Sequence, residues 1–203
     1  AWNYICSAAE SETTMRRNRM SLDCLAFRPK VLIDVGNVDI STTFLGYKLE
    51  IPVMLAPMGG VQNYAEGGAL VPDNACEECG SINFVSTVTQ PDLEVTAANS
   101  PHPKVFQLYI RGDEEWIRVM VRRACDAGYA ALALTVDSAY YGNRERLSRE
   151  QLADRRPPAR EFQKRLTWDS VKLIQDELAG LPLIIKGIMR PEDAARADEL
   201  GVE

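Results

Sequence analysis

Short apolar runs alternate with longer amphipathic stretches along the chain from residue 53 onward. The runs are apolar at successive positions, whereas the stretches between them repeat apolar residues at the helical spacing of three and four. The runs predict strands over residues 53–57, 82–86, 105–109, 131–136 and 183–185. The stretches predict helices over residues 67–79, 92–98, 113–127, 168–178 and from Pro191 onward.

Strands that are apolar on both faces and joined by helical crossovers indicate a parallel sheet covered by helices, an α/β fold. The sequence has no Gly-x-Gly-x-x-Gly turn, so the repeated units favour a (β/α)8 TIM barrel over a doubly wound sheet. We expect a single barrel domain over residues 1–203, in which residues 1–50 form a cap of helices and a hairpin around Leu45–Lys48. Residues 51–203 then supply the first five strand-helix units, with a long polar loop over residues 138–165.

Composition narrows the classes of partner. The chain has 203 residues, a net charge of −6 and a pI of about 5.0, which argues against nucleic-acid and anionic-membrane partners. No apolar run reaches the roughly 18 to 20 residues that span a bilayer, so we expect a cytoplasmic protein. Five cysteines suit reduced thiols better than a disulfide framework. Cys76 and Cys79 have metal-site spacing but no second Cys or His pair accompanies them, so we predict no metal site.

Polar and small residues collect where the predicted strands end. In a barrel the active site lies at the carboxyl ends of the strands. Glycines let backbone approach a planar ligand, short polar side chains supply hydrogen bonds, and a lysine supplies a positive charge. This set suits a neutral heteroaromatic ring with an electron-rich edge. Its members are Pro57, Met58, Gly59, Gly60, Ser86, Thr87, Gln107, Tyr109, Thr135, Asp137 and Lys186.

Lys186 has three readings from its position alone. It can contact the cofactor, form an ion pair with a carboxylate such as Asp137, or act as a Schiff-base nucleophile of an aldolase if burial depresses its pKa. The single histidine, His102, lies in a Pro-His-Pro turn before the third strand, at the amino end of the barrel. A general base must therefore come from elsewhere.

Segments throughout the chain resemble the FMN-dependent α-hydroxy acid oxidase and dehydrogenase family, which includes glycolate oxidase, lactate oxidase and mandelate dehydrogenase. They are, in chain order, NYICSAAESETTMRRN, FRPKVLIDV, TTFLGYKLEIPVMLAPMG, VFQLYIRGD, DAGYAALALTVDSAYYGNRE and RLTWDSVKLIQDELAGLPLIIKGIMRPEDA. The sequence of these segments most resembles the lactate 2-monooxygenase-like branch of the family.

The resemblance implies FMN as cofactor and a role for each matching residue. Pro57, Met58 and Gly59 would lie against the flavin through their backbone. Ser86, Gln107 and Thr135 would supply polar flavin contacts, and Lys186 a cation at the N1–C2=O edge. Tyr4 and Arg144 would hold the carboxylate of a small L-2-hydroxy acid, Tyr109 would contact that substrate near its hydroxyl, and residues 138–165 would form a mobile lid. We thus assign Tyr109 and Lys186 as catalytic.

Departures from the family pattern qualify this reading. The family's Ser-Asn-His-Gly-x-Arg segment, which carries the general base and a second arginine, does not occur in the sequence. Val88 stands where short-chain oxidases often carry tryptophan, so the substrate is left open. We expect the amino-terminal part of an FMN-dependent oxidoreductase that passes electrons to oxygen or another acceptor and forms a homo-oligomer. The alternatives are a non-catalytic or partner-completed flavin-binding subunit and a lysine-dependent aldolase.

Overall fold

The computed structural model describes residues 2–140, 142–147 and 160–202. The chain forms two compact units, Ala1–Asp39 with Tyr141–Pro157, and Ile40–Tyr140 with Pro158–Glu203. The part of the predicted lid over residues 148–159 lies outside the described residues.

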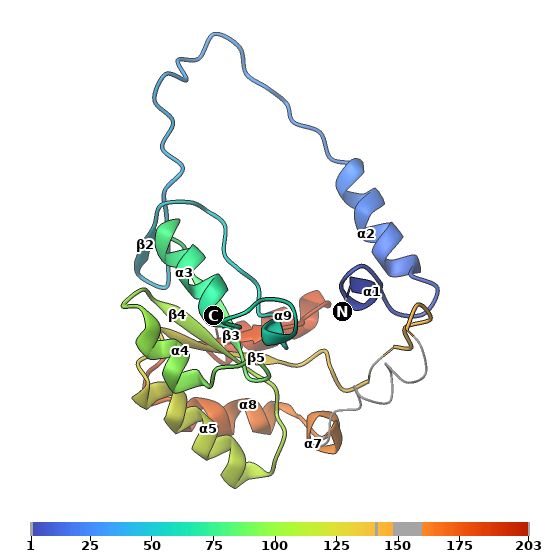
Figure 1. Ribbon diagram of the computed structural model, residues 1–203, viewed down its shortest axis with the longest axis vertical. Helices are drawn as coiled ribbons and strands as arrows, with labels where there is room; N and C mark the ends of the chain where they lie inside the picture. Colours follow the sequence, from blue (N-terminus) through green and yellow to red (C-terminus); the bar gives the residue numbers. More distant parts are fainter. Residues whose placement is uncertain (1, 141, 148–159, 203) are drawn as a thin grey trace. The chain divides into compact units, whose positions relative to one another are not determined.

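A parallel sheet forms the centre of the larger unit (Figure 1). Its neighbours follow sequence order, so each strand pairs with the next and the order never reverses. That winding is typical of a barrel and differs from the switch in strand order of a doubly wound sheet. Four of the predicted strands are thereby confirmed, with bounds β3 Asn83–Ser86, β4 Lys104–Leu108, β5 Ala131–Thr135 and β6 Leu183–Lys186.

The first predicted strand, residues 53–57, is wrong as a strand. Leu55 makes a single parallel bridge to Asn83, in which Leu55 N–H donates to Ile82 O at 3.1 Å. Prolines at positions 52 and 57 lack the N–H groups that a longer ladder requires. The segment nevertheless lies beside β3, which extends the sequential order of the sheet by one position.

The predicted helices all form, within one to three residues of the predicted bounds. Asp113 caps α5 as expected, because its carboxylate accepts from Trp116 N–H at 3.0 Å. Thr167 and Ser170 form a capping box at the start of α8. The helices are α3 Leu70–Glu78, α4 Leu93–Asn99, α5 Glu114–Asp126, α8 Trp168–Glu177 and α9 Pro191–Glu199, with a 3₁₀ turn η1 over Val61–Asn63. A further short helix, α7 Arg160–Lys164, lies within the segment predicted as loop.

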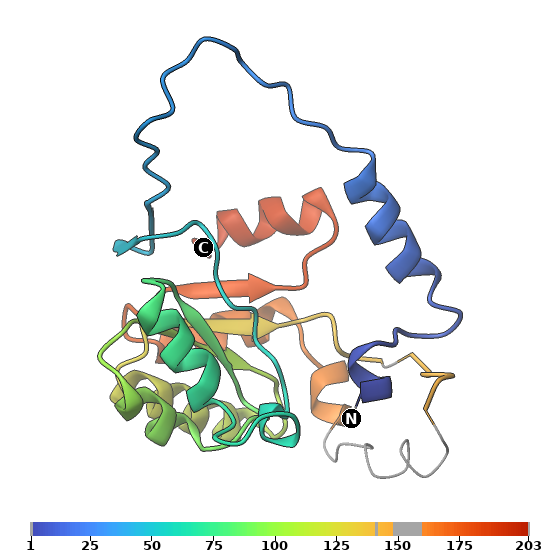
Figure 2. The ribbon, with the colours of Figure 1, turned by 45° about the horizontal axis from the view of Figure 1, so that its top comes forward.

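The two faces of the sheet bury different residues. Alternate positions such as Phe106, Leu132 and Leu134 pack against α4, α5 and α8 in the main apolar cluster, and these helices run along one face in both views (Figures 1 and 2). The intervening positions, including Val105 and Ala133, form a second, smaller cluster on the other face. Because side chains alternate along a strand, the residues that share this second face can be read off the sequence.

A hairpin covers the second face at the amino ends of the strands. It consists of β1 Thr42–Phe44 and β2 Tyr47–Leu49, as predicted around Leu45–Lys48. Leu45 and Gly46 both have positive φ, 49° and 80°, as a two-residue hairpin turn with the twist of the strands requires. Leu49 is fully buried in the smaller cluster, and the Phe44 and Phe84 rings lie 6.5 Å apart.

The smaller unit contains α1 Trp2–Ile5 and α2 Thr13–Asp23, and none of the residues of α2 is buried. Glu12 precedes α2 in the left-handed region at φ 59°. Its carboxylate accepts from Ala8 N–H, which lowers the pKa of Glu12, and the neighbouring Arg146 guanidinium lowers it further. Among the described helices, none combines the length and apolarity that crossing a bilayer demands.

Candidate functional site

Four predicted cofactor residues form a row across the carboxyl ends of the sheet. The register pairs Ser86 with Gln107 and Thr135 with Lys186. Gln107 pairs across β4 and β5 with Ala133, two residues before Thr135, so all four lie on the same face. We call Ser86, Gln107, Thr135 and Lys186 the polar row. It continues the face of the smaller apolar cluster toward the end where barrel active sites lie.

The centre of the polar row is buried and joined by a hydrogen bond. Gln107 is 1% exposed and Thr135 is fully buried. Gln107 Nε2 donates to Thr135 Oγ1 at 2.7 Å. The Oε1 atom of the same carboxamide is buried and accepts no hydrogen bond from any described residue. A buried acceptor without a partner is uncommon and favours a donor group of a ligand at this position.

Lys186 lies at one end of the polar row. Its Nζ atom lies 4.0 Å from Asp137 Oδ2, and the two side chains keep 39% and 48% of their surface exposed. An ion pair this long and exposed contributes little to stability. Gly187, at φ 112°, follows the lysine, and a Cβ there would lie 2.7 Å from Asp137 Cβ. Glycine therefore permits the close approach of Asp137 to the strand that carries Lys186.

The loop predicted to lie against the cofactor reaches the other end of the polar row. Gly60 N–H donates to Val88 O at 3.0 Å, which fixes the loop beside the end of β3. A Cβ on Gly59 would lie 2.7 Å from Val88 Cγ2 and 4.0 Å from Ser86 Oγ. Met58 is 56% exposed and Pro57 is half-buried. The structure thus brings Gly59, at the end of this segment, next to Ser86.

Tyr109 follows β4 directly and is half-buried. Its backbone N–H donates to Thr87 Oγ1 at 3.1 Å, and Thr87 Oγ1 in turn donates to Gln107 O at 2.5 Å. The threonine hydroxyl therefore continues the pairing of β3 and β4 past the last ladder residues. This bond fixes the backbone from which the Tyr109 side chain projects.

Tyr4 and Arg144 contact each other within the smaller unit. The Arg144 guanidinium lies 4.3 Å from the centroid of the Tyr4 ring and donates to Tyr4 O at 3.1 Å. It also donates to the backbone oxygen of Ser7. The two residues predicted to bind a substrate carboxylate are thus brought together, and the stacked guanidinium is held in a fixed plane.

One buried polar residue beside the candidate site escaped the sequence analysis. Gln163, on α7, is 6% exposed, and its carboxamide bonds the backbone at the ends of both β4 and β5. It lies within the polar segment 138–165, where neither periodicity nor a motif distinguishes one glutamine from its neighbours.

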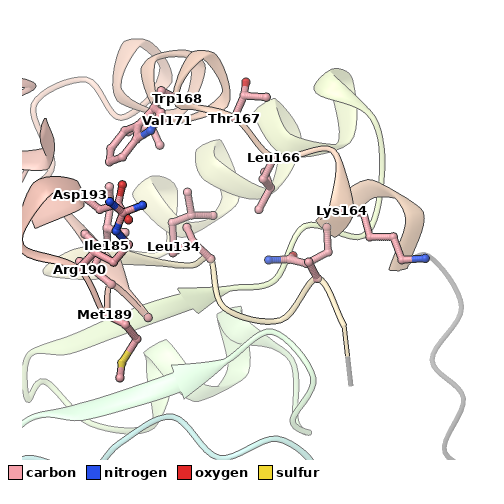
Figure 3. A pocket seen from close by; sticks show the side chains of 15 residues that line it. Leu134, Lys164, Leu166, Thr167, Trp168, Val171, Ile185, Met189, Arg190 and Asp193 are labelled. Carbon is pink, nitrogen blue, oxygen red and sulfur yellow. The ribbon is translucent and has the colours of Figure 1, made fainter. Parts of the chain in front are cut away.

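A cavity of about 440 Å³ lies on the opposite face of the sheet (Figure 3). Leu134 and Ile185 reach it from the helix-facing side of β5 and β6, Trp168 and Val171 from α8, and Asp193 from α9. None of the described residues that line it carries a buried polar atom without a partner, unlike Gln107 in the polar row. We therefore place the candidate site at the polar row.

Comparison with known proteins identifies the family of the chain. The family model described as FMN-dependent dehydrogenase matches residues 1–160 and 150–203. The chain belongs to this family. Among curated members, an L-lactate oxidase of Nostoc sp. is 34% identical over 100% of the chain and 64% of its own length. Glycolate oxidase 3 of Arabidopsis thaliana is 31% identical over 98% of the chain and 61% of its own length.

Solved structures of a mandelate oxidase and a flavocytochrome b2 share the fold. A mandelate oxidase variant with a C4a-OH-FMN adduct gives a TM-score of 0.85 at 28% identity, over 99% of this chain and 61% of that one. A flavocytochrome b2 variant with sulfite bound gives 0.87 at 29% identity, over 100% and 52%. The chain thus has the parallel α/β sheet of a partial TIM barrel. It spans less than two thirds of the length of these relatives.

Proposed function

We propose that the chain is the amino-terminal, flavin-ring-binding part of an FMN-dependent enzyme that oxidises a small L-2-hydroxy acid to the 2-keto acid. The buried, unpartnered Gln107 Oε1 within the polar row carries this proposal. It is a buried acceptor that no described residue satisfies, in a chain whose family is FMN-dependent.

The residues at the site fit a flavin ring. Gln107 Oε1 would accept a hydrogen bond from a ring N–H, and Ser86 offers a short hydroxyl on the same face. Residues 57–59 would place backbone against the ring, since Gly59 carries no side chain. Lys186 would place its positive charge at the ring edge that is richest in electrons. Together these groups supply hydrogen-bond donors, an acceptor and one cation. Such a set complements the polar edge of a neutral planar heterocycle.

FMN, when bound, would supply a two-electron acceptor for the α-carbon of the substrate and pass the electrons to oxygen or another acceptor. The chain's own residues then have supporting roles. Lys186 would favour the extra negative charge of the reduced cofactor through its fixed cation. Tyr109 would donate to the substrate at its hydroxyl or carboxylate end. Arg144 would bind the carboxylate by a charge-assisted hydrogen bond.

The proton on the substrate hydroxyl needs a base that this sequence does not supply in the expected motif. A second candidate is therefore a flavin-binding subunit that a partner chain completes. The mass of the protein isolated from its source distinguishes the two. A mass of 22.6 kDa favours the partner-completed subunit. A mass larger by about 60% favours a longer single chain, because the chain spans 61–64% of the length of its relatives.

An anaerobic spectrum tests the reaction class. The protein isolated from its source should be yellow and lose its visible absorbance when L-lactate or glycolate is added without oxygen. A colourless protein that borohydride links covalently to a carbonyl substrate at Lys186 would instead indicate an aldolase. The 39% exposure of the Lys186 side chain argues against the buried amine that this chemistry needs. The homo-oligomer and the cytoplasmic location stay predictions.

A further inference from the structure

The Gln163 side chain uses both ends of its carboxamide on two neighbouring strands. Its Oε1 atom accepts from Ile110 N–H at 2.8 Å, and its Nε2 atom donates to Thr135 O at 2.6 Å. The side chain is almost fully buried, at 6% exposure. Hydrogen bonds in such surroundings are costly to lose, because the backbone groups would remain buried without partners.

These two bonds lie where the ladder between β4 and β5 ends. The last register pair joins Leu108 to Leu134, and Ile110 and Thr135 follow it. Gln163 therefore adds one more connection between the two strands, supplied from a segment far along the chain. The strands that it joins carry Gln107, Tyr109 and Thr135, which are the buried part of the candidate site.

The backbone oxygen and the hydroxyl of Thr135 each accept a hydrogen bond from a glutamine. Its backbone oxygen accepts from Gln163 Nε2, and its hydroxyl accepts from Gln107 Nε2 at 2.7 Å. A shift of the Thr135 backbone would move the hydroxyl and therefore rotate the Gln107 carboxamide. The orientation of the unpartnered Gln107 Oε1 atom thus depends on Gln163 through one intervening residue.

Gln163 adds polar contacts to the apolar attachment of α7. Phe162 packs against the main apolar cluster, whereas Lys164 is exposed and lies 5.2 Å from the centroid of the Tyr140 ring. The 440 Å³ cavity borders Gln163 and Leu166, so apolar packing is incomplete beside the helix (Figure 3). The hydrogen bonds of Gln163 link α7 to the strand ends beside this cavity.

We propose that Gln163 is a positioning residue for the flavin ring: it fixes the carboxyl ends of β4 and β5 and thereby aims Gln107 Oε1 at the ligand. The part of this inference that concerns the flavin rests on the proposed function. The two hydrogen bonds of Gln163 require one donor and one acceptor on the same side chain. Glutamate at this position therefore keeps only the bond to Ile110, and leucine keeps neither.

Three variants of the full chain test the proposal. Gln163→Leu removes both bonds at similar volume, and Gln163→Glu removes the bond to Thr135. Gln175→Leu is the matched control, since Gln175 Nε2 also donates to a backbone oxygen, that of Leu200 at 2.8 Å, but on α8. For each variant we would measure three quantities: the melting temperature, the NMR resonances of the Gln107 side-chain amide, and the affinity for FMN.

At a temperature well below the melting temperature of each variant, Gln163→Leu should shift the Gln107 amide resonances and weaken FMN binding about tenfold. Gln163→Glu should do the same to a smaller degree, and Gln175→Leu should leave both readouts unchanged. Unchanged Gln107 resonances in both Gln163 variants would overturn the proposal, whatever their melting temperatures. If the wild-type protein binds no FMN, the proposed function fails, and the Gln107 resonances still decide whether Gln163 positions that side chain.

Discussion

Gln107 Nε2 donates a hydrogen bond of 2.7 Å to Thr135 Oγ1, and no described residue bonds the Oε1 atom of the same carboxamide. The pair joins β4 to β5 through side chains rather than backbone. It restrains one amide group of the polar row and leaves its Oε1 acceptor buried without a partner among the described residues.

The two residues should show coupled effects on stability. Thr135→Val removes the acceptor and leaves Gln107 Nε2 buried without a partner, so we expect a loss of about 1–3 kcal/mol in the free energy of unfolding. The double variant Gln107→Leu/Thr135→Val should lose less free energy of unfolding than the two single variants lose in sum. In the double variant neither strand buries a polar group without its partner. Urea denaturation of the four proteins checks this. Additive losses would show that the bond contributes nothing specific.

Removing the charge of Lys186 should affect the reduced cofactor more than the oxidised one. Lys186→Met should make the reduction potential of bound FMN more negative, by about 30 mV for each tenfold loss of preference for the reduced form. Lys186→Arg keeps the charge and should retain most of the wild-type potential. Reductive titration against a reference dye measures the shift. Equal potentials in wild type and Lys186→Met would mean that the lysine does not lie near the ring.

The stacked pair in the smaller unit leads to a prediction about ligand carboxylates. Arg144→Met should weaken the binding of pyruvate, a 2-keto acid, to the FMN-loaded protein by at least about tenfold. Arg146→Met is the control, because Arg146 forms an ion pair with Glu12 in the same unit. The flavin spectrum reports binding. If Arg146→Met weakens pyruvate binding as much as Arg144→Met, the assignment of Arg144 is wrong.

A buried ion pair beneath the amino ends of the strands should dominate local stability. Lys104 Nζ lies 3.5 Å from Asp73 Oδ1, with side-chain exposures of 4% and 0%. Lys104→Met leaves the buried Asp73 carboxylate without its cation and should lower the free energy of unfolding by about 3–5 kcal/mol. Arg19→Ala, in an exposed pair with Asp23, should cost less than about 1 kcal/mol. Thermal unfolding distinguishes the two, and a small effect of Lys104→Met would mean that solvent reaches Asp73.

His102 should make stability depend on pH in a defined window. Burial, and then the nearby Lys104 charge, lower the pKa of His102 from its usual 6.5. As the pH falls, His102 therefore takes up its proton at a higher pH in the unfolded chain than in the folded one. Its contribution to the free energy of unfolding is constant above the unfolded pKa of about 6.5. It should decline as the pH falls from there toward the lowered folded pKa. His102→Gln should remove this decline, and a variant whose profile matches the wild type would contradict the assignment.

The strand ends were predictable because apolar runs mark the strands and the fold places their carboxyl ends together. Gln107, Thr135 and Lys186 could thus be assigned to one site from the amino-acid sequence alone. The short α7 helix and Gln163 could not, since a five-residue helix has no period to detect and its energy comes from contacts with β4 and β5. Residues 53–57 failed as a strand because prolines limit the pairing to Leu55.

The most direct measurement is an equilibrium titration of FMN with the purified protein, followed by the visible absorbance of the flavin, for wild type and Gln107→Leu. A ring held at the polar row predicts a saturable spectral change with the wild type and binding at least about tenfold weaker with Gln107→Leu. No spectral change with the wild type, or equal affinities for the two proteins, would contradict a flavin site at the polar row.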